Sequence, residues 1–451
     1  MPSVQTGGKV FLFLQGPPGI FARTVADELE LLGCRTLRVN LCPGDWLGWH
    51  DRRSTDYRGR LENWQDWLRD FCKKNQVTDI IYYADRVPYH VAAAEVGAEL
   101  GITCTAFEFG YLRPDWITLE RNGMSVHSLF PNDPDEIRKA AENLPPVNRD
   151  KLYPYPFYAE AFNEVTFNMA NVLFKAFYPF FNRDKLYHPL PDYLSNIPRF
   201  AFASRRNRNA THLIDDVISV GLPYFVFPLQ LQSDYQLRYN SQYDHIADAV
   251  EEVISSFAKS APVAARLVFK LHPLDNGIEP WRKILRKLAR KYGIKKRAYI
   301  IDGGNLDHLL QHAAGALTIN STTGIHALRV GCPTKVLGIA LYDIPGLTCQ
   351  RPLDDFWKDG TRPDQDLVED LERLLAKTIQ VKGCFYTDKG RRAGASAMAR
   401  RLVEGTVNLP GALCPEAPRL EKAKALGIAT TFAEQMASPT RTELWSYAWR
   451  E

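Results

Sequence analysis

Four stretches of the chain bring together side chains that could perform acid–base or phosphate chemistry. In the first, FEFGYLRPDWITLE at 107–120, Glu108 follows a β-prone run and precedes Tyr111, Arg113 and Trp116. In open α/β sheets, ligands bind at the carboxyl ends of the strands. Glu108 is therefore a candidate acid/base group; the alternative is that it caps a turn whose aromatic residues pack.

The second stretch, PLQLQSDYQ at 228–236, directly follows a predicted strand. It places polar side chains at alternate positions, namely Gln230, Gln232, Asp234 and Gln236. Alternating polar residues at the carboxyl end of a strand are difficult to reconcile with a buried core. The stretch is either a solvated loop or one side of a ligand site.

The third stretch is KLHPLD at 270–275, which also begins at the end of a predicted strand. Lys270 and His272 alternate, so both side chains would point to one side of an extended chain. Pro273 would end the strand and fix the exit of the backbone. A lysine and a histidine in this position are suitable donors to a phosphate group.

The fourth stretch, INSTTG at 319–324, lies between a predicted strand and a predicted helix, and it contains Asn320, Ser321, Thr322 and Gly324. Polar side chains and free backbone N–H groups at the start of a helix can hold an anion. Serine and threonine are also ordinary N-caps, and one structure can serve both purposes.

The elements that position these stretches follow a repeated β–α alternation. In the first half, strands are predicted at 9–15, 35–40, 79–84 and 103–107, with helices at 21–32, 61–74 and 88–100. This order is typical of a Rossmann-like parallel sheet. The glycine loop at 16–19 lacks the lysine of a phosphate-binding P-loop, so a plain tight connection is favoured there.

A second alternation begins after three prolines at 189, 191 and 198. Strands are predicted at 200–204, 224–227, 267–271, 298–301, 316–319 and 335–337. We therefore expect a first Rossmann-like domain at 1–195, a second at 196–360, and a helical segment with an unassigned tail at 361–451 that can fold back across the first. The predicted fold class is α/β of the GT-B type, with two Rossmann-like domains facing a cleft, an architecture that serves several functions.

The segment at 151–181 is unusually rich in aromatic residues, and apolar positions between Phe162 and Ala176 recur at helical spacing. Basic residues at 175, 183 and 185 flank it. This composition suits a helix that touches lipid headgroups, and it also suits a helix packed between two domains.

Composition narrows the class of protein. The 451 residues carry a formal net charge of +4, which is too small to indicate a nucleic-acid partner. The eight cysteines form no CxxC pair, which indicates reduced thiols and a cytoplasmic location. No metal-ligand spacing such as HExxH is present, and no apolar run approaches the ~20 residues of a membrane span. We expect a soluble or peripheral protein without a metal.

Five motifs in order resemble a known family. FEFGYLRPDWITLE, PLQLQSDYQ, KLHPLDNG, INSTTGIHAL and KVLGIALYDIPGLT are similar to motifs of the capsular polysaccharide synthesis glycosyltransferases. These are the Kps-type β-Kdo transferases, and the single-module, KpsS-like members are the nearest match. The resemblance runs from about residue 9 to residue 348.

The resemblance implies a GT-B glycosyltransferase that needs no cofactor and uses CMP-β-Kdo as its donor substrate. It implies transfer with retention of the β configuration onto a phosphatidylglycerol-type lipid, which starts the Kdo linker of Gram-negative capsules. The implied location is the cytoplasmic face of the inner membrane, as a peripheral protein alongside other capsule-assembly proteins.

The resemblance also implies roles for individual residues. The motifs that bind CMP in the family map to His272 with Pro273 and to Ser321 with Thr322, and its acidic-x-Gly motif maps to Glu108 and Gly110. Many relatives carry a second acidic residue where this chain has Phe109.

Retention of configuration is compatible with a two-step route through a carboxylate nucleophile. On this basis Asp234 is the candidate nucleophile and Glu108 the acid/base. Lys270, Asn320 and Gly324 complete the donor side, and the acceptor side consists of Tyr111, Arg113 and Trp116. Two alternatives remain open: transfer from another CMP-sugar, such as a CMP-sialic acid, and a non-catalytic role in capsule export or assembly.

Overall fold

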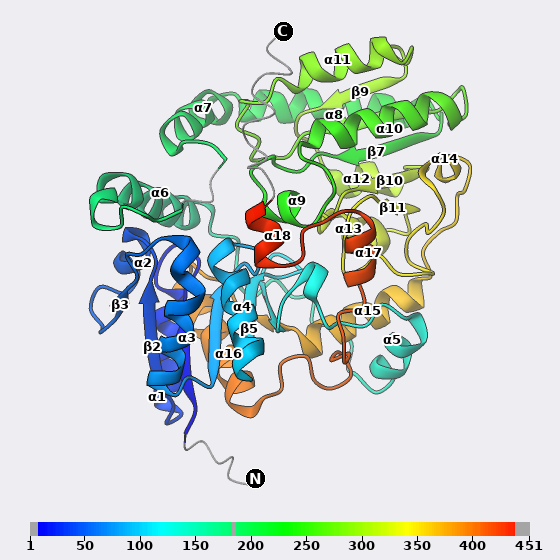
Figure 1. Ribbon diagram of the computed structural model, residues 1–451. Coiled ribbons are helices and arrows are strands. Elements are labelled where there is room, and N and C mark those ends of the chain that lie inside the picture. The colour runs from blue at the N-terminus through cyan, green and yellow to red at the C-terminus, as the bar shows by residue number, and fades with distance from the viewer. Residues whose placement is uncertain (1–7, 183–185, 438–451) are drawn as a thin grey trace.

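In the computed structural model, two α/β units lie one beside the other, and the chain crosses between them more than once (Figure 1). The structure describes residues 8–182 and 186–437. Each unit is built on its own twisted sheet with helices on both faces, as β–α alternation requires. The predicted fold class, two Rossmann-like domains in a GT-B arrangement, is confirmed.

The first sheet has seven strands in the order β12-β6-β5-β4-β1-β2-β3. The five strands from β5 to β3 are parallel, whereas β6 and β12 are antiparallel to their neighbours. The strands are β1 (Val10–Phe13), β2 (Arg35–Asn40), β3 (Thr55–Asp56), β4 (Asp79–Tyr83), β5 (Thr103–Phe109), β6 (Trp116–Arg121) and β12 (Gln380–Lys382).

Helices cover both faces of this sheet. The apolar sides of α3 and α4 pack on one face, and those of α1 and α16 pack on the other. The helical elements of this part of the chain are α1 (Phe21–Leu31), α2 (Pro43–Leu47), η1 (Leu61–Asn63), α3 (Trp64–Asn75), α4 (Pro88–Leu100), η2 (Ser125–His127), α5 (Pro134–Ala141), α6 (Phe157–Leu173) and η3 (Lys175–Phe177).

The second sheet has five parallel strands in the order β11-β10-β7-β8-β9. These are β7 (Tyr224–Pro228), β8 (Arg266–Lys270), β9 (Ala298–Ile301), β10 (Gly315–Thr318) and β11 (Thr334–Val336). The helices between and before them are α7 (Pro189–Ala201), α8 (Ala203–Ser219), α9 (Tyr235–Tyr239), α10 (Ile246–Ser260), α11 (Trp281–Lys291), α12 (Leu306–Gln311) and α13 (Thr323–Arg329).

After the second sheet, the chain returns to the first unit. Strand β12 pairs with β6, and α16 packs along α1 at the other end of the sequence (Figure 1). Helix α14 (Leu353–Phe356) still packs on the second unit, and it is followed by α15 (Gln365–Thr378), α16 (Asp388–Glu404), α17 (Leu420–Ala425) and α18 (Phe432–Ala437). None of the described helices is both long enough and apolar enough to cross a bilayer.

Two predictions about local structure are wrong. The run at 200–204 is helical, as the end of α7 and the start of α8, because a short apolar run does not distinguish a strand from a helix. The predicted strand at 103–107 extends to Phe109 as β5, and residues 116–121 form β6, so the first motif is a β-hairpin. Glu108 therefore lies within β5, directly opposite Thr118, and not beyond the end of the strand.

A buried arginine from the C-terminal segment ties the two units together. The Arg419 side chain is 4% exposed and donates to the carbonyl oxygens of Phe130 at 2.6 Å, Pro131 at 3.1 Å and Leu341 at 2.6 Å. The first two follow the first sheet, and Leu341 follows β11 of the second. Each buried carbonyl would otherwise lack a donor, which is costly in a low-dielectric interior.

Replacing Arg419 should therefore loosen the contact between the units. We expect Arg419→Met, which keeps similar side-chain volume, to lower the free energy of unfolding by about 3–5 kcal/mol in urea denaturation. Lys424→Met is the matched control, because its exposed ammonium pairs with the exposed carboxylate of Glu421 and should contribute at most about 1 kcal/mol. Equal effects of the two changes would contradict the role of Arg419.

Candidate active site

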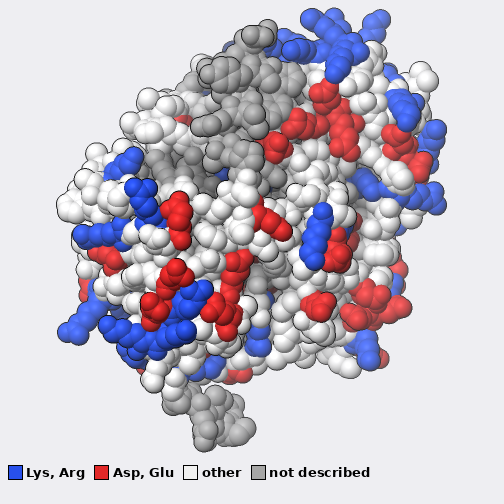
Figure 2. Space-filling model, in the orientation of Figure 1, with Lys and Arg blue, Asp and Glu red and all other residues white. Residues whose placement is uncertain are grey.

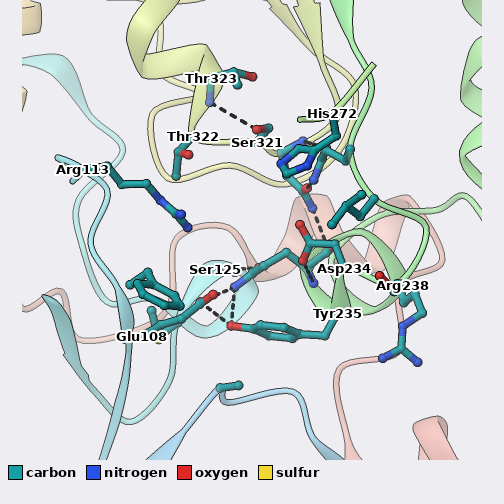
Figure 3. A pocket seen from close by; sticks show the side chains of 18 of the residues that line it. Glu108, Arg113, Ser125, Asp234, Tyr235, Arg238, His272, Ser321, Thr322 and Thr323 are labelled. Carbon is teal, nitrogen blue, oxygen red and sulfur yellow. Dashed lines mark hydrogen bonds between the residues drawn. The ribbon is translucent and has the colours of Figure 1, made fainter. Parts of the chain in front are cut away.

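A cavity of about 740 Å³ lies between the two units and collects most of the residues singled out in the sequence (Figure 3). The hairpin of β5 and β6 forms one side of it, and the segments that follow strands β7, β8 and β10 form the other. Among its lining residues are Glu108, Tyr111, Arg113, Gln230, Asp234, Lys270, His272, Pro273, Asn320, Ser321 and Thr322. Candidate groups from segments more than 200 residues apart in the chain, such as Glu108 and Thr322, thus lie around one cavity.

Glu108 is held from across the cavity. Its Oε2 accepts hydrogen bonds from the Tyr235 hydroxyl and from Gln236 Nε2, the latter at 3.0 Å. Both donors belong to α9 of the second unit. Burial raises the pKa of Glu108 to about 7; the Tyr235 hydrogen bond opposes this rise, and the nearby charge of Asp234 adds to it. The carboxyl group is therefore positioned to exchange a proton near neutral pH.

The amide of Gln236 has its orientation fixed by the groups around it. Its Oε1 accepts from Ser125 Oγ and from Asn240 Nδ2, both at 2.7 Å. Its Nε2 therefore points toward Glu108 and also reaches the Tyr235 hydroxyl at 2.7 Å. Tyr235 and Ser125 were not predicted from the sequence as site residues. The position of Tyr235 next to Asp234 could have identified Tyr235 as a site residue. No feature of the sequence pointed to Ser125.

Asp234 both begins α9 and faces the cavity. Its Oδ1 accepts from the backbone N–H of Gln236 at 2.9 Å, which makes it the N-cap of the helix. Burial raises its pKa, while that N–H and the Gln230 side chain oppose the rise. In the view of Figure 3, Asp234 lies between His272 above and Tyr235 below. The cap uses one carboxylate oxygen, so its presence does not exclude chemistry at the other.

His272 is a neutral hydrogen-bond donor. Its Nδ1 accepts from the backbone N–H of Leu274 at 3.1 Å, so its proton must be on Nε2, the atom left for other partners. Burial lowers the pKa of His272 to about 4, and the positive charges of Arg113 and Lys270 lower it further. The imidazole is therefore uncharged at pH 7 and offers one N–H.

Lys270, the last residue of β8, adds a cation beside this donor. It is 5% exposed, and burial lowers its pKa, although the charge of Asp302 favours the ammonium form. Within residues 8–182 and 186–437, its ammonium forms no hydrogen bond or ion pair. A nearly buried cation that lines a cavity without a partner favours an anionic ligand.

The residues of the segment at 319–324 have two roles: some line the cavity, and others support the packing around it. Ser321 and Thr322 line the cavity, whereas Asn320 also donates through Nδ2 to the Gln236 carbonyl at 2.8 Å and so joins this turn to α9. Gly324 is buried beneath Tyr342, where an added Cβ would lie 2.2 Å from the phenol oxygen. Gly324 therefore allows close packing and does not line the cavity.

The three residues predicted for the acceptor side differ in position. Tyr111 and Arg113 line the cavity, and the Arg113 guanidinium lies 5.2 Å from the centre of the Phe109 ring. Trp116 does not line it: the side chain is 9% exposed, belongs to a core cluster, and has the Lys382 ammonium 4.6 Å from its ring centre. The structure therefore does not bring Trp116 to the site, because it is the first residue of β6 and packs inward.

Gln232, which the sequence grouped with the polar stretch, supports the fold. It accepts from the N–H of Ile246 at 2.8 Å and donates to the Asp244 carbonyl at 3.2 Å. It thus fixes the start of α10 and does not line the cavity. Among the described residues, no group of three or more His, Cys, Asp and Glu side chains is arranged to hold a metal ion.

Comparison with known proteins places the chain in a family. The model of the family described as "Capsule polysaccharide biosynthesis protein" matches residues 78–386, which include both sides of the cavity. The chain belongs to this capsule polysaccharide biosynthesis family. The resemblance inferred from the five motifs is thereby confirmed.

Individual relatives cover most of this family member. The chain is 31% identical over 388 residues to the capsule polysaccharide export protein KpsS of Escherichia coli. The matched region covers 85% of this chain and 98% of that protein. The chain is also 29% identical over 391 residues to the capsule polysaccharide modification protein LipB of Neisseria meningitidis serogroup A, covering 83% and 91%. A solved structure titled Thermosulfurimonas dismutans KpsC, beta Kdo 2,7 transferase, is 14% identical with a TM-score of 0.41, covering 87% of this chain and 98% of that one.

Proposed function

We propose that this capsule biosynthesis protein is a retaining glycosyltransferase that moves Kdo from CMP-β-Kdo to a phosphatidylglycerol-type lipid. The observation that carries the proposal is the interdomain cavity, which brings Glu108 of the first unit together with Asp234, Lys270 and His272 of the second. Two carboxyl groups supply what a retaining transfer needs, and the cationic and N–H donors supply what a leaving phosphate needs. The reaction would start the Kdo linker of a capsule at the cytoplasmic face of the inner membrane, next to other capsule-assembly proteins.

The donor side suits a nucleoside monophosphate sugar. The Lys270 ammonium and the Nε2–H of His272 offer one charge and one neutral donor to a phosphate. The Ser321 and Thr322 hydroxyls add polar groups at the same wall. Because these groups read the nucleotide phosphate and not the sugar, they are compatible with CMP-Kdo and with a CMP-sialic acid.

The first step is substitution at the anomeric carbon of the donor. An ionised Asp234 attacks this carbon, an Asp234 oxygen–carbon bond forms, and the bond between the carbon and the CMP phosphate breaks. The phosphate leaves with its electron pair and is stabilised by Lys270 and His272 in a site where water screens little. No proton is transferred in this step.

The second step restores the original configuration. The acceptor hydroxyl loses its proton to Glu108 Oε1 or Oε2, its oxygen attacks the anomeric carbon, and the bond to Asp234 breaks. Tyr235 and Gln236 hold the Glu108 carboxylate in place for this transfer. Two inversions give net retention, with CMP and one proton released.

The first unit offers features that suit a lipid phosphate as acceptor. Arg113 lines the cavity and forms no ion pair or hydrogen bond to another described residue, so its guanidinium is available to a phosphodiester. Beside the cavity, α6 leaves large apolar side chains in solvent, with Tyr158 86% and Phe162 71% exposed. Phe167 of the same helix lines the cavity itself, so an acyl chain could lie along α6 while its headgroup enters.

The proposal is tested by incubating the protein with CMP-Kdo and a fluorescent phosphatidylglycerol analogue, with the product identified by mass. We expect transfer from CMP-Kdo, and a loss of at least about a hundredfold in kcat for Glu108→Gln and for Asp234→Asn. Asparagine is as good an N-cap as aspartate, so Asp234→Asn removes the charge while α9 keeps its start.

Two single changes at exposed carboxylates, Glu142→Gln and Asp215→Asn, serve as matched controls. Each should leave the transfer rate unchanged. If the protein transfers sugar only from CMP-sialic acid, the proposed donor CMP-Kdo is wrong and CMP-sialic acid takes its place. Failure of any CMP-sugar to react, together with failure of CMP to bind, would contradict the proposal and favour a non-catalytic role in capsule export or assembly.

The pKa of Glu108 gives a second prediction. A base must be ionised to accept a proton, so the transfer rate should fall as the pH drops through about 7. Removing the Tyr235 hydroxyl removes a hydrogen bond that lowers this pKa. Tyr235→Phe should therefore move the acid limb of the pH–rate profile to higher pH.

The control for this profile is Tyr292→Phe, which removes a hydrogen bond between a tyrosine and a carboxylate, that of Glu251, outside the cavity. It should leave the acid limb in place. An unchanged limb in Tyr235→Phe would show that another group titrates there.

A further inference from the structure

Helix α11 and the turn after it form a concentrated positive surface. Residues 281–297 contain nine Lys or Arg residues and no Asp or Glu. Because the whole chain has a formal net charge of only +4, the rest of the chain is net negative. Figure 2 shows Lys and Arg side chains gathered at the upper edge of the molecule, where Figure 1 draws α11.

The cations of α11 lie on its solvent side. The apolar side chains of the helix, from Trp281 to Ala289, are buried in the core of the second unit. Arg282, Lys283, Arg286 and Arg290 are exposed. None of these four side chains forms an ion pair or hydrogen bond with another residue in the described part of the chain. Their charge is therefore available to a partner.

At the end of α11, Glu251 pairs with Lys291 at 2.5 Å, whereas the acidic residues near the start of the helix are engaged elsewhere. Asp275 lies 3.6 Å from Arg199, and Asp302 lies 3.1 Å from the same guanidinium. Glu279 accepts from the Tyr187 hydroxyl at 2.6 Å. These carboxylates hold α7 and the segment before it against the second unit, so they do not neutralise the outer face of α11.

Exposed apolar side chains lie on helix α7, which is linked to the segment before α11. Helix α7 is attached to the segment before α11 by a hydrogen bond of 2.7 Å from Asn276 Nδ2 to Asp192 Oδ1. Along α7, Leu190 is 47% exposed and Leu194 is 64% exposed. Helix α7 in turn contacts α6, whose exposed aromatic residues continue the apolar surface. A cationic helix thus adjoins a set of solvent-exposed apolar side chains.

We propose that α11 docks the protein onto a bilayer that carries anionic headgroups. The apolar side of α11 is used in the core, so the helix cannot insert and acts through charge alone, while α6 and α7 offer the apolar contact. Clustered Lys and Arg residues near an anionic bilayer each add to the binding. A nucleic acid would use the cations but gives no reason for exposed leucines at 190 and 194.

The docking is measured by flotation of the full-length protein with vesicles of phosphatidylcholine alone or with about one third phosphatidylglycerol. We expect binding to the anionic vesicles only, and weaker binding as salt shortens the Debye length below about 10 Å. Binding should fall at least about tenfold when four cations of α11 are neutralised as Arg282→Gln, Lys283→Gln, Arg286→Gln and Arg290→Gln.

A matched control removes the same charge from exposed positions at the opposite end of the molecule. These changes are Lys139→Gln, Lys377→Gln, Lys389→Gln and Arg400→Gln, and they should leave vesicle binding within about twofold of the wild type. Thermal melting of both variants establishes that they fold. The α11 residues do not line the cavity, so transfer to a short-chain acceptor in detergent should be unchanged.

Three results would overturn the proposal: unchanged flotation of the folded α11 variant, equal loss in the two variants, or equal binding to vesicles without anionic lipid. Retention of the protein on duplex DNA or RNA that depends on α11, without vesicle binding, would assign the surface to nucleic acid instead. Flotation is measured without donor or acceptor, so an absence of Kdo transfer in the wild type would contradict the proposed function and leave the docking result standing.

Discussion

The site depends on hydrogen bonds that cross from one unit to the other and end on a single carboxyl group. Glu108 lies in a strand of the first sheet, and its donors Tyr235 and Gln236 lie on a short helix of the second unit. A buried carboxylate without donors would be costly, so the arrangement favours the two units in this relative position. The same contacts affect the pKa of Glu108, so the acid–base chemistry of this group depends on how the two units pack.

A division of charge across the cavity follows from this arrangement. Lys270 is the last residue of β8, and His272 lies two residues beyond it. Both are therefore at the edge of the second sheet where the parallel strands present their carboxyl ends. The carboxyl groups lie where α9 meets the hairpin. A ligand with a phosphate at one end and a sugar carbon at the other is oriented by these two environments. The position of Lys270 and the tautomer of His272 therefore say more about how a ligand is oriented than the presence of either residue does.

Much of the fold could be predicted because its patterns are local. The parallel strands and most helices follow from apolar runs separated by polar turns, and Lys270 and His272 could be grouped from their alternation. Contacts between distant segments could not be predicted in this way. The antiparallel pairing of β6 placed Trp116 in the core, and the sequence around it gave no signal of which face it would take. The donors to Glu108 come from more than 120 residues away, and only three-dimensional packing brings them there.

The most direct test of the account is a crystal structure of the protein with bound CMP. The account predicts the phosphate within hydrogen-bonding distance of His272 Nε2 and Lys270 Nζ, with the space toward Asp234 and Glu108 left for the sugar. CMP bound outside this cavity, or a phosphate that contacts neither side chain, would contradict it.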